Sequence, residues 1–146
     1  MELQQFLVKA KKATYAAHAK ENKLADGCKE LTYEEAEWKY RDRYFGANPF
    51  SGQEVVWKNN KLVWTMNYYG KITSNAEKEV AAFLRKAMKQ VTETRPFRGP
   101  SNFKEGDFEY VDASIGTAEQ FSGTEKIFLK KKEMYRLLYH GGSMNR

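Results

Sequence analysis

Two aspartates, Asp42 and Asp112, lie in matching contexts, each two residues after a tyrosine and shortly before a glycine-containing loop. Paired carboxylates can serve as acid and base in catalysis. Because both aspartates have the same local surroundings, we interpret each as structural, accepting hydrogen bonds from backbone N–H groups of the following strand. The proposed structural motif comprises Tyr40, Asp42, Tyr110 and Asp112.

Two glutamates recur in the same way, since Glu54 and Glu125 each follow a Phe-Ser-Gly sequence by one residue. On the expected strands both point away from the apolar face, with Glu125 opposite Arg136. Such glutamates are usually solvated or ion-paired, and the alternative is contact with a ligand. An enzyme built on Asp42, Asp112, Glu54 and Glu125 remains a further alternative.

Other catalytic and metal-binding arrangements lack the residues that they need. Ser51 and Ser122 do not lie in the Gly-x-Ser-x-Gly turn that exposes a nucleophile. His18, His140 and Cys28 are the only residues of their types, and no ligand spacing connects them. We therefore expect no catalytic residues, no metal and no cofactor, which favours a non-enzymatic protein.

These recurrences belong to one internal repeat with a spacing of about seventy residues. Each copy predicts one helix followed by three strands. The sequence therefore predicts an α+β fold made of two tandem α-β-β-β repeats related by a pseudo-twofold, with antiparallel sheet and both helices packed on one face. We expect a single domain over 1–146, with the first repeat at about 1–72 and the second at about 73–146.

Apolar periodicity places the helices. Leu3, Phe6, Leu7 and Ala10 form a helical stripe, with Lys9, Lys11 and Lys12 on the solvent side. Ser74 and Glu77 form a capping-box pattern before a second stripe. Residues 18–32 are expected to be a polar connector. The expected strands are 37–45, 50–58, 62–69, 107–115, 121–129 and 133–140.

The hairpin turn fixes the expected register. Asn59-Asn60 suits a two-residue turn because asparagine tolerates positive φ. An uninterrupted ladder from this turn places Val55 opposite Trp64 on the apolar face, and Glu54 opposite Thr65 on the other face.

Composition limits the partners. The chain has 146 residues, a net charge of +6, a pI of about 9.3 and 14% aromatic residues. This charge permits binding to anionic small molecules, nucleic acid or acidic proteins. No apolar run approaches the length of about 20 residues that a membrane helix needs, so no membrane association is expected. A single cysteine fits a cytoplasmic protein.

Several longer motifs are specific as a group. They are Tyr40-Arg41-Asp42-x-Tyr44-Phe45-Gly46, Phe50 to Asn59, Trp64-x-Met66-Asn67-Tyr68-Tyr69-Gly70, Pro96-Phe97-Arg98-Gly99-Pro100 and Tyr139-His140-Gly141-Gly142. Together they resemble the bacterial family called domain of unknown function 5680, over nearly the whole chain. Members of that family can follow a helix-turn-helix DNA-binding domain, and the resemblance therefore implies a sensor or effector role in regulators. It brings no catalytic residues.

We therefore expect a non-enzymatic module that binds a small ligand, anionic and planar, such as a nucleotide, as a sensor or by sequestration. A homodimer or higher homo-oligomer is compatible with this expectation. The alternative is a nucleic-acid or protein interaction module of a regulatory system. The candidate ligand-binding residues are Arg41, Glu54, Thr65, Asn67, Tyr69, Arg98, Glu125, Arg136 and His140.

Overall fold

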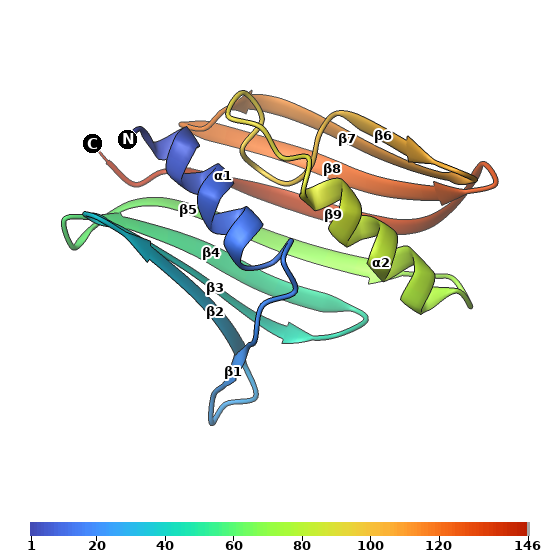
Figure 1. The fold of residues 1–146 in the computed structure, drawn as a ribbon, viewed down its shortest axis with the longest axis horizontal. Coiled ribbons are helices and arrows are strands. Elements are labelled where there is room, and N and C mark those ends of the chain that lie inside the picture. Colours follow the sequence, from blue (N-terminus) through green and yellow to red (C-terminus); the bar gives the residue numbers. More distant parts are fainter. Residues whose placement is uncertain (146) are drawn as a thin grey trace.

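The computed structural model describes residues 1–145 and contains two helices and nine strands. Figure 1 shows both helices against the same side of a curved sheet. Along the chain the elements are α1 (Leu3–Ala13), β1 (Asn22–Lys23), β2 (Lys29–Glu35), β3 (Trp38–Gly46), β4 (Phe50–Lys58), β5 (Lys61–Ile72), α2 (Glu77–Met88), β6 (Asn102–Glu105), β7 (Phe108–Thr117), β8 (Gln120–Leu129) and β9 (Lys132–Ser143).

All nine strands form one antiparallel sheet in the order β1-β2-β3-β4-β5-β9-β8-β7-β6. The two halves of the chain meet where β5 pairs with β9, from Trp64 opposite Ser143 to Ile72 opposite Tyr135. The expected α+β class and antiparallel pairing are confirmed. The expected total of six strands is wrong, because β1, β2 and β6 were not recognised.

The strand β2 shows why the prediction failed there. It runs through part of the expected connector and through a glutamate-rich stretch. Only Leu31 is buried in it, and Tyr33 is half-buried. With so few apolar residues, the strand is held mainly by its ladder with β3.

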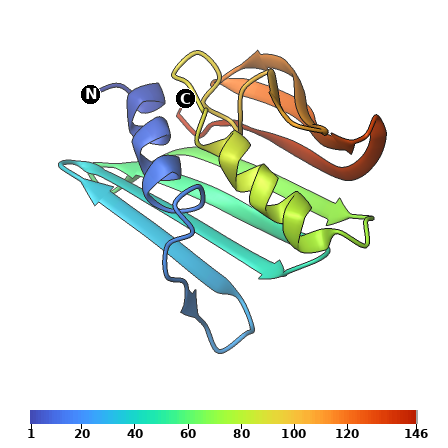
Figure 2. The same ribbon diagram turned by 45° about the vertical axis from the view of Figure 1, so that its right-hand side comes forward.

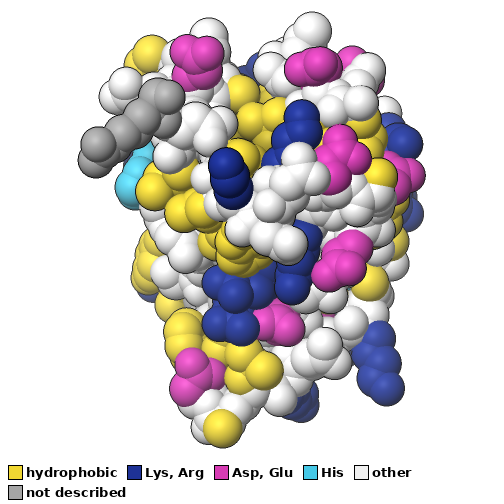
Figure 3. Space-filling model, turned by 90° about the vertical axis from the view of Figure 1, so that its left-hand side faces the viewer, with side chains coloured by type: hydrophobic (Ala, Val, Ile, Leu, Met, Phe, Trp, Pro, Cys, Tyr) yellow, Lys and Arg dark blue, Asp and Glu magenta, His cyan; other side chains and the backbone are white. Residues whose placement is uncertain are grey.

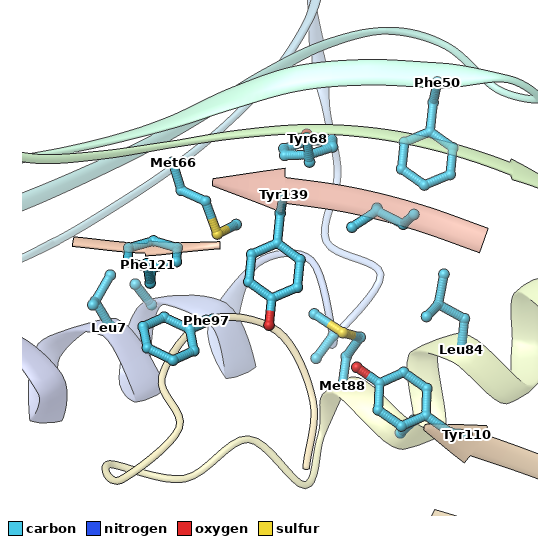
Figure 4. Packing of buried hydrophobic residues seen from close by; sticks show 14 of the residues in the cluster. Leu7, Phe50, Met66, Tyr68, Leu84, Met88, Phe97, Tyr110, Phe121 and Tyr139 are labelled. Carbon is cyan, nitrogen blue, oxygen red and sulfur yellow. The ribbon is translucent and has the colours of Figure 1, made fainter. Parts of the chain in front are cut away.

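Each helix buries one apolar stripe against the concave side of the sheet, as Figure 2 also shows. In α1, Phe6 is fully buried and stacks on Trp38 with ring centroids 5.3 Å apart. In α2, Phe83 stacks on Phe108 at 4.9 Å. The close-up in Figure 4 shows Leu7, Phe97 and Phe121 meeting between helix, loop and sheet. Aromatic rings thus fill most of the space between the layers.

The capping box expected at the start of α2 is absent. The N-cap is Ala76, and its N–H donates to the Ser74 hydroxyl at 2.9 Å in a local turn. Glu77 instead accepts a hydrogen bond from the Asn48 side chain. A capping box does occur at α1, where Gln5 accepts from the Glu2 N–H at 2.9 Å.

A one-residue bulge shifts the register in each of the two long hairpins. Trp57 pairs with Leu62, as the turn predicts, but Val56 pairs with Trp64, which leaves Val63 as the extra residue. A one-residue shift sends every later side chain to the other face. Glu54 therefore lies opposite Met66 and not Thr65, and it points into the core.

The β8–β9 hairpin contains the matching bulge at Met134. Ile127 pairs with Tyr135, which places Glu125 opposite Leu137 and not Arg136. The expected solvent-facing Glu125–Arg136 pair is thus wrong. Each bulge also connects the halves, because the Met134 carbonyl accepts from the Thr73 N–H and the Val63 carbonyl accepts from the Met144 N–H, both at 2.8 Å.

Two glycines make room for tyrosine rings on the concave side. A Cβ on Gly52 would lie 2.5 Å from the Tyr68 hydroxyl, and one on Gly123 would overlap the ring of Tyr139. This close approach explains why the same Ser-Gly-x-Glu pattern starts β4 and β8.

We predict that Gly123→Ala lowers the free energy of unfolding by about 1–3 kcal/mol, because the new methyl group must displace Tyr139. Urea unfolding measures this change. The control is Ser122→Ala, which alters the exposed neighbour on the outer face and should stay within about 0.5 kcal/mol of the parent. Equal stability of the two variants would contradict the proposed contact.

Candidate functional site

The concave interior holds a network of buried carboxylates and tyrosines. In the first half, Tyr68 donates to Asp42 at 2.6 Å, and Tyr40 donates to Glu54 at 2.8 Å. The ammonium group of Lys11, which is 1% exposed, donates to Glu54 at 2.9 Å and to a backbone carbonyl. Asp42 and Glu54 are direct cross-strand partners, so two carboxylates lie side by side away from water.

The second half contains the corresponding contacts. Tyr139 donates to Asp112 at 2.7 Å, and Tyr110 donates to Glu125. Arg98 is 1% exposed and binds Glu125 through two nitrogens at 3.0 and 3.3 Å. Arg98 comes from the loop after α2, whereas the first half uses a lysine of α1.

The hydrogen bonds of the two aspartates differ from our expectation. Their carboxylates accept from tyrosine hydroxyls two strands away in the sheet, not from the backbone at a strand start. The guanidinium of Arg95 also lies 3.9 Å from Asp112. The Tyr-x-Asp motif thus connects three adjacent strands in each half.

Burial and crowding of like charges shift the pKa values in this network. Burial first, and then the charge of Glu54, raise the pKa of Asp42 to about 7. Asp112 has a pKa of about 7 for the same two reasons, with Glu125 as the neighbouring charge. Burial lowers the pKa of Lys11 more than the charge of Glu54 raises it. The interior therefore contains groups that titrate near neutral pH.

Beside this network, a cavity of about 260 Å³ opens between the segment after α1, the helix α2 and the sheet. We call it the helix–sheet pocket. Tyr15, Tyr44, Phe50 and Tyr68 supply its aromatic walls. The other lining residues are Thr14, His18, Ala19, Glu21, Lys29, Leu31, Gly46, Ala47, Ile72, Ala81, Leu84 and Arg85.

The pocket contacts the network through two tyrosines. The guanidinium of Arg98 lies over the rings of Tyr15 and Tyr68, at 5.0 and 5.5 Å from their centroids. Tyr68 also donates to Asp42. None of the four buried carboxylates lines the pocket itself. A ligand in the pocket would contact the rings of Tyr15 and Tyr68, which lie against the buried guanidinium of Arg98. It would also contact the network through Tyr68, which is hydrogen-bonded to Asp42.

The nine candidate residues from the sequence separate into two groups. Glu54, Arg98 and Glu125 are buried in the network, whereas the other six lie on the outer face of the sheet. Outside, Thr65, Asn67 and His140 share a groove of about 730 Å³. Tyr69 and Arg136 line a separate hollow of about 290 Å³, and Arg41 packs over Trp57 at 5.0 Å. The structure thus brings these residues into three outer locations and one interior one.

Sequence reasoning missed Lys11 and Tyr15. It placed Lys11 on the solvent side of the first helix, which is wrong, since its ammonium is buried against Glu54. A signal was present: Lys11 is four residues after Leu7 and next to Ala10, within the buried stripe. Tyr15 follows Lys11 by one further turn.

The fold and the pocket define a class of α+β domain. In it, two helices pack on the concave side of a curved antiparallel sheet, beside a pocket lined by aromatic residues. The chain belongs to the family described as a domain of unknown function (DUF5680), whose model matches residues 42–144. The resemblance inferred from the motifs is thereby confirmed, with a match that begins at Asp42 and leaves α1, β1 and β2 outside it. No curated protein and no solved structure matches the chain significantly.

Two further findings concern residues 1–145. No helix there is both long and apolar enough to cross a membrane. In the same range, no three His, Cys, Asp or Glu residues are grouped closely enough to hold a metal ion.

We predict that stability falls as pH rises between about 4 and 7. An aspartate titrates near pH 3.9 in an unfolded chain, whereas Asp42 and Asp112 titrate at about 7 in the fold. The folded state thus binds more protons in this window, and this contribution to the free energy of unfolding is lost as pH rises through 7.

Asp42→Asn should make this decline shallower, because the amide cannot ionise yet still accepts from Tyr68. Urea unfolding at a series of pH values measures the slope. Asp107→Asn, in the exposed turn before β7, is the control and should keep the parent slope. If the slope of stability against pH is the same in Asp42→Asn as in the parent, the raised pKa assigned to Asp42 is refuted.

We also predict that Lys11→Met costs about 3–5 kcal/mol of stability, because it leaves Glu54 buried without its cation. Adding Glu54→Gln should recover part of this loss, so the double variant is more stable than the sum of the single changes implies. Lys12→Met, which alters an exposed residue of the same helix, should change stability by less than about 0.5 kcal/mol. If the changes in the free energy of unfolding caused by Lys11→Met and Glu54→Gln simply add in the double variant, the two residues are not coupled.

Proposed function

We propose that this protein is a non-enzymatic module that binds a small, planar, anionic ligand in the helix–sheet pocket, as a sensor or by sequestration. The proposal rests mainly on one observation: a pocket with four aromatic lining residues and basic residues at its edge lies between the segment after α1, the helix α2 and the sheet. Rings of this kind stack on planar molecules, and basic groups at the edge favour a negative charge.

The basic residues at the edge of the pocket support an anionic ligand. Lys29 and Arg85 line the pocket from β2 and α2, and His18 lies near them, while Glu21 is the one carboxylate in the lining. The ammonium of Lys29 lies 5.5 Å from the centre of the Tyr44 ring. A positive charge and an aromatic ring therefore lie next to each other, an arrangement that suits a ligand with an aromatic ring and an anionic substituent.

The volume limits the size of the ligand. A cavity of about 260 Å³ lies just below the range of about 300–1,000 Å³ typical of ligand sites. It is suited to a single ring system, such as a nucleobase or an aromatic acid. A nucleotide would place its base inside and its phosphate at Lys29 and Arg85.

A non-enzymatic role is favoured by the state of the carboxylates. Glu54 and Glu125 are 2% and 0% exposed and are bound by cations and tyrosines. Asp42 and Asp112 accept from Tyr68 and Tyr139. With these hydrogen bonds made and none of the four in the pocket lining, these carboxylates are better suited to organising the interior than to transferring protons to a ligand.

We further infer that the two halves are equivalent α-β-β-β units related by a pseudo-twofold. The support is the recurrence of the same contacts: tyrosine to aspartate, tyrosine to glutamate, and a bulge at the same place in each hairpin. The helix–sheet pocket then arises where the units differ, because Tyr15 and Tyr44 line it and come from the first unit alone.

A pair of variants on α2 tests the pocket. Ala81 lines it and the exposed Ala82 does not. We predict that Ala81→Leu fills the pocket and abolishes the thermal shift caused by aromatic carboxylates and nucleotides, while Ala82→Leu retains it. The measurement is a thermal-shift screen of the parent protein, followed by titration of the best compound. No response of the parent to any planar anion, or equal responses of the two variants, would refute the proposal.

A further inference from the structure

Basic side chains gather at one end of the β8–β9 hairpin and the adjoining end of β5, on the outer face of the sheet. We call this surface the basic hairpin. It comprises Lys71, Lys126, Lys130, Lys131, Lys132 and Arg136. The nearby carboxylates are Glu133, on β9, and Asp107, whose backbone carbonyl accepts from the Lys130 N–H at 3.0 Å.

The register aligns three of these cations in a row across the strands. Lys71 lies directly opposite Arg136, and Arg136 lies directly opposite Lys126. Like charges in such pairs repel each other. Glu133 offsets part of the repulsion, at 3.0 Å from Arg136 and 3.6 Å from Lys126. Within residues 1–145, no carboxylate pairs with Lys71 or with the three consecutive lysines of the turn.

The turn between β8 and β9 contains two lysines in a backbone conformation that disfavours side chains other than those of asparagine and aspartate. Lys130 and Lys131 have positive φ values of 50° and 68°. The corresponding turn of the first half has φ values of 50° and 63° and is made by Asn59 and Asn60, which tolerate this conformation well. The second half therefore carries exposed charge at positions where local stability favours asparagine or glycine. On the face that Figure 3 shows, basic, acidic and hydrophobic side chains are intermixed.

Exposed apolar groups lie beside the row of cations. Tyr69 is 53% exposed and lies on the same face of β5 as Lys71, two residues away. It is directly opposite Leu138, which is 56% exposed. Together with Thr73 and Arg136 they line a hollow of about 290 Å³. An accessible aromatic ring thus adjoins a line of positive charge.

We propose that the basic hairpin binds single-stranded nucleic acid. Strands in a sheet are about 4.8 Å apart, so the row of three cations extends over about 10 Å. A linear polyanion fits this row and the turn lysines beyond it better than a compact anion does, since one phosphate cannot reach them all. The ring of Tyr69 supplies a stacking platform for an unpaired base.

This surface is separate from the helix–sheet pocket. The pocket is lined by the segment after α1, by α2 and by inward residues of the sheet, and it shares no lining residue with the hollow beside the basic hairpin. A small ligand and a nucleic acid could therefore be bound at the same time. The inference does not depend on occupancy of the pocket.

Fluorescence anisotropy with labelled single-stranded and duplex oligonucleotides of about 12 nucleotides tests the proposal, in both DNA and RNA and over a range of salt concentrations. We expect the full chain to prefer single strands and to lose affinity steeply as salt rises. The triple variant Lys130→Gln, Lys131→Gln and Lys132→Gln should weaken binding at least about tenfold. It should also reduce the slope of log Kd against log salt by about 2, since each lost phosphate contact on a single strand contributes about 0.7.

The matched control removes the same charge elsewhere, through Lys12→Gln, Lys20→Gln and Lys23→Gln, all exposed residues. It should bind as the parent does. Tyr69→Leu should weaken single-strand binding and leave weak duplex binding unchanged. Thermal unfolding of each variant checks that the fold is retained.

Three outcomes would overturn the proposal. One is absence of binding by the parent at low salt, and another is an equal loss of affinity in the control triple variant. The third is a preference for duplex together with unchanged binding by Tyr69→Leu, which would refute the assignment to single strands.

Discussion

The interior of this protein depends on burying two pairs of carboxylates on the concave side of the sheet. The bulges at Val63 and Met134 turn Glu54 and Glu125 inward, beside Asp42 and Asp112. Buried charges of one sign must be offset by hydrogen bonds and by opposite charges. Tyrosines of the sheet supply the hydrogen bonds, but within residues 1–145 no lysine or arginine of a strand forms an ion pair with these four carboxylates. The cations come from outside the sheet.

This requirement explains how the helical layer is attached. Lys11 extends from α1 and Arg98 from the loop after α2, and each reaches a glutamate. The ion pairs specify the position of two segments that apolar packing alone would hold less uniquely. The aromatic stacking of Phe6 on Trp38 and of Phe97 on Phe121 then fills the space between layers. The helix–sheet pocket remains where the turn after α1 passes over Tyr68 and Phe50.

Much of this arrangement follows from the sequence. Periodicity identified both helices, and the turn at Asn59-Asn60 correctly set Trp57 opposite Leu62. The bulges could not be read in the same way. Val63 and Met134 are ordinary strand residues, and the hydrogen bonds that stabilise their carbonyls come from Met144 and Thr73, which are distant in sequence. One undetected residue in each hairpin was enough to place Glu54 and Glu125 on the wrong face. Lys11 was misplaced for a related reason: its partner Glu54 is recognised only once that glutamate points inward.

The two halves use different cations for the same task, and this difference separates their acid–base behaviour. A guanidinium stays protonated at any pH a folded protein meets, so Arg98 is a permanent charge. An ammonium can release its proton, and burial lowers the pKa of Lys11. In alkaline solution the cation of the first half can therefore lose its charge, whereas the cation of the second half cannot. Two sites with nearly the same geometry thus differ in whether their cation can be titrated, and the helix–sheet pocket adjoins both through Tyr68 and Tyr15.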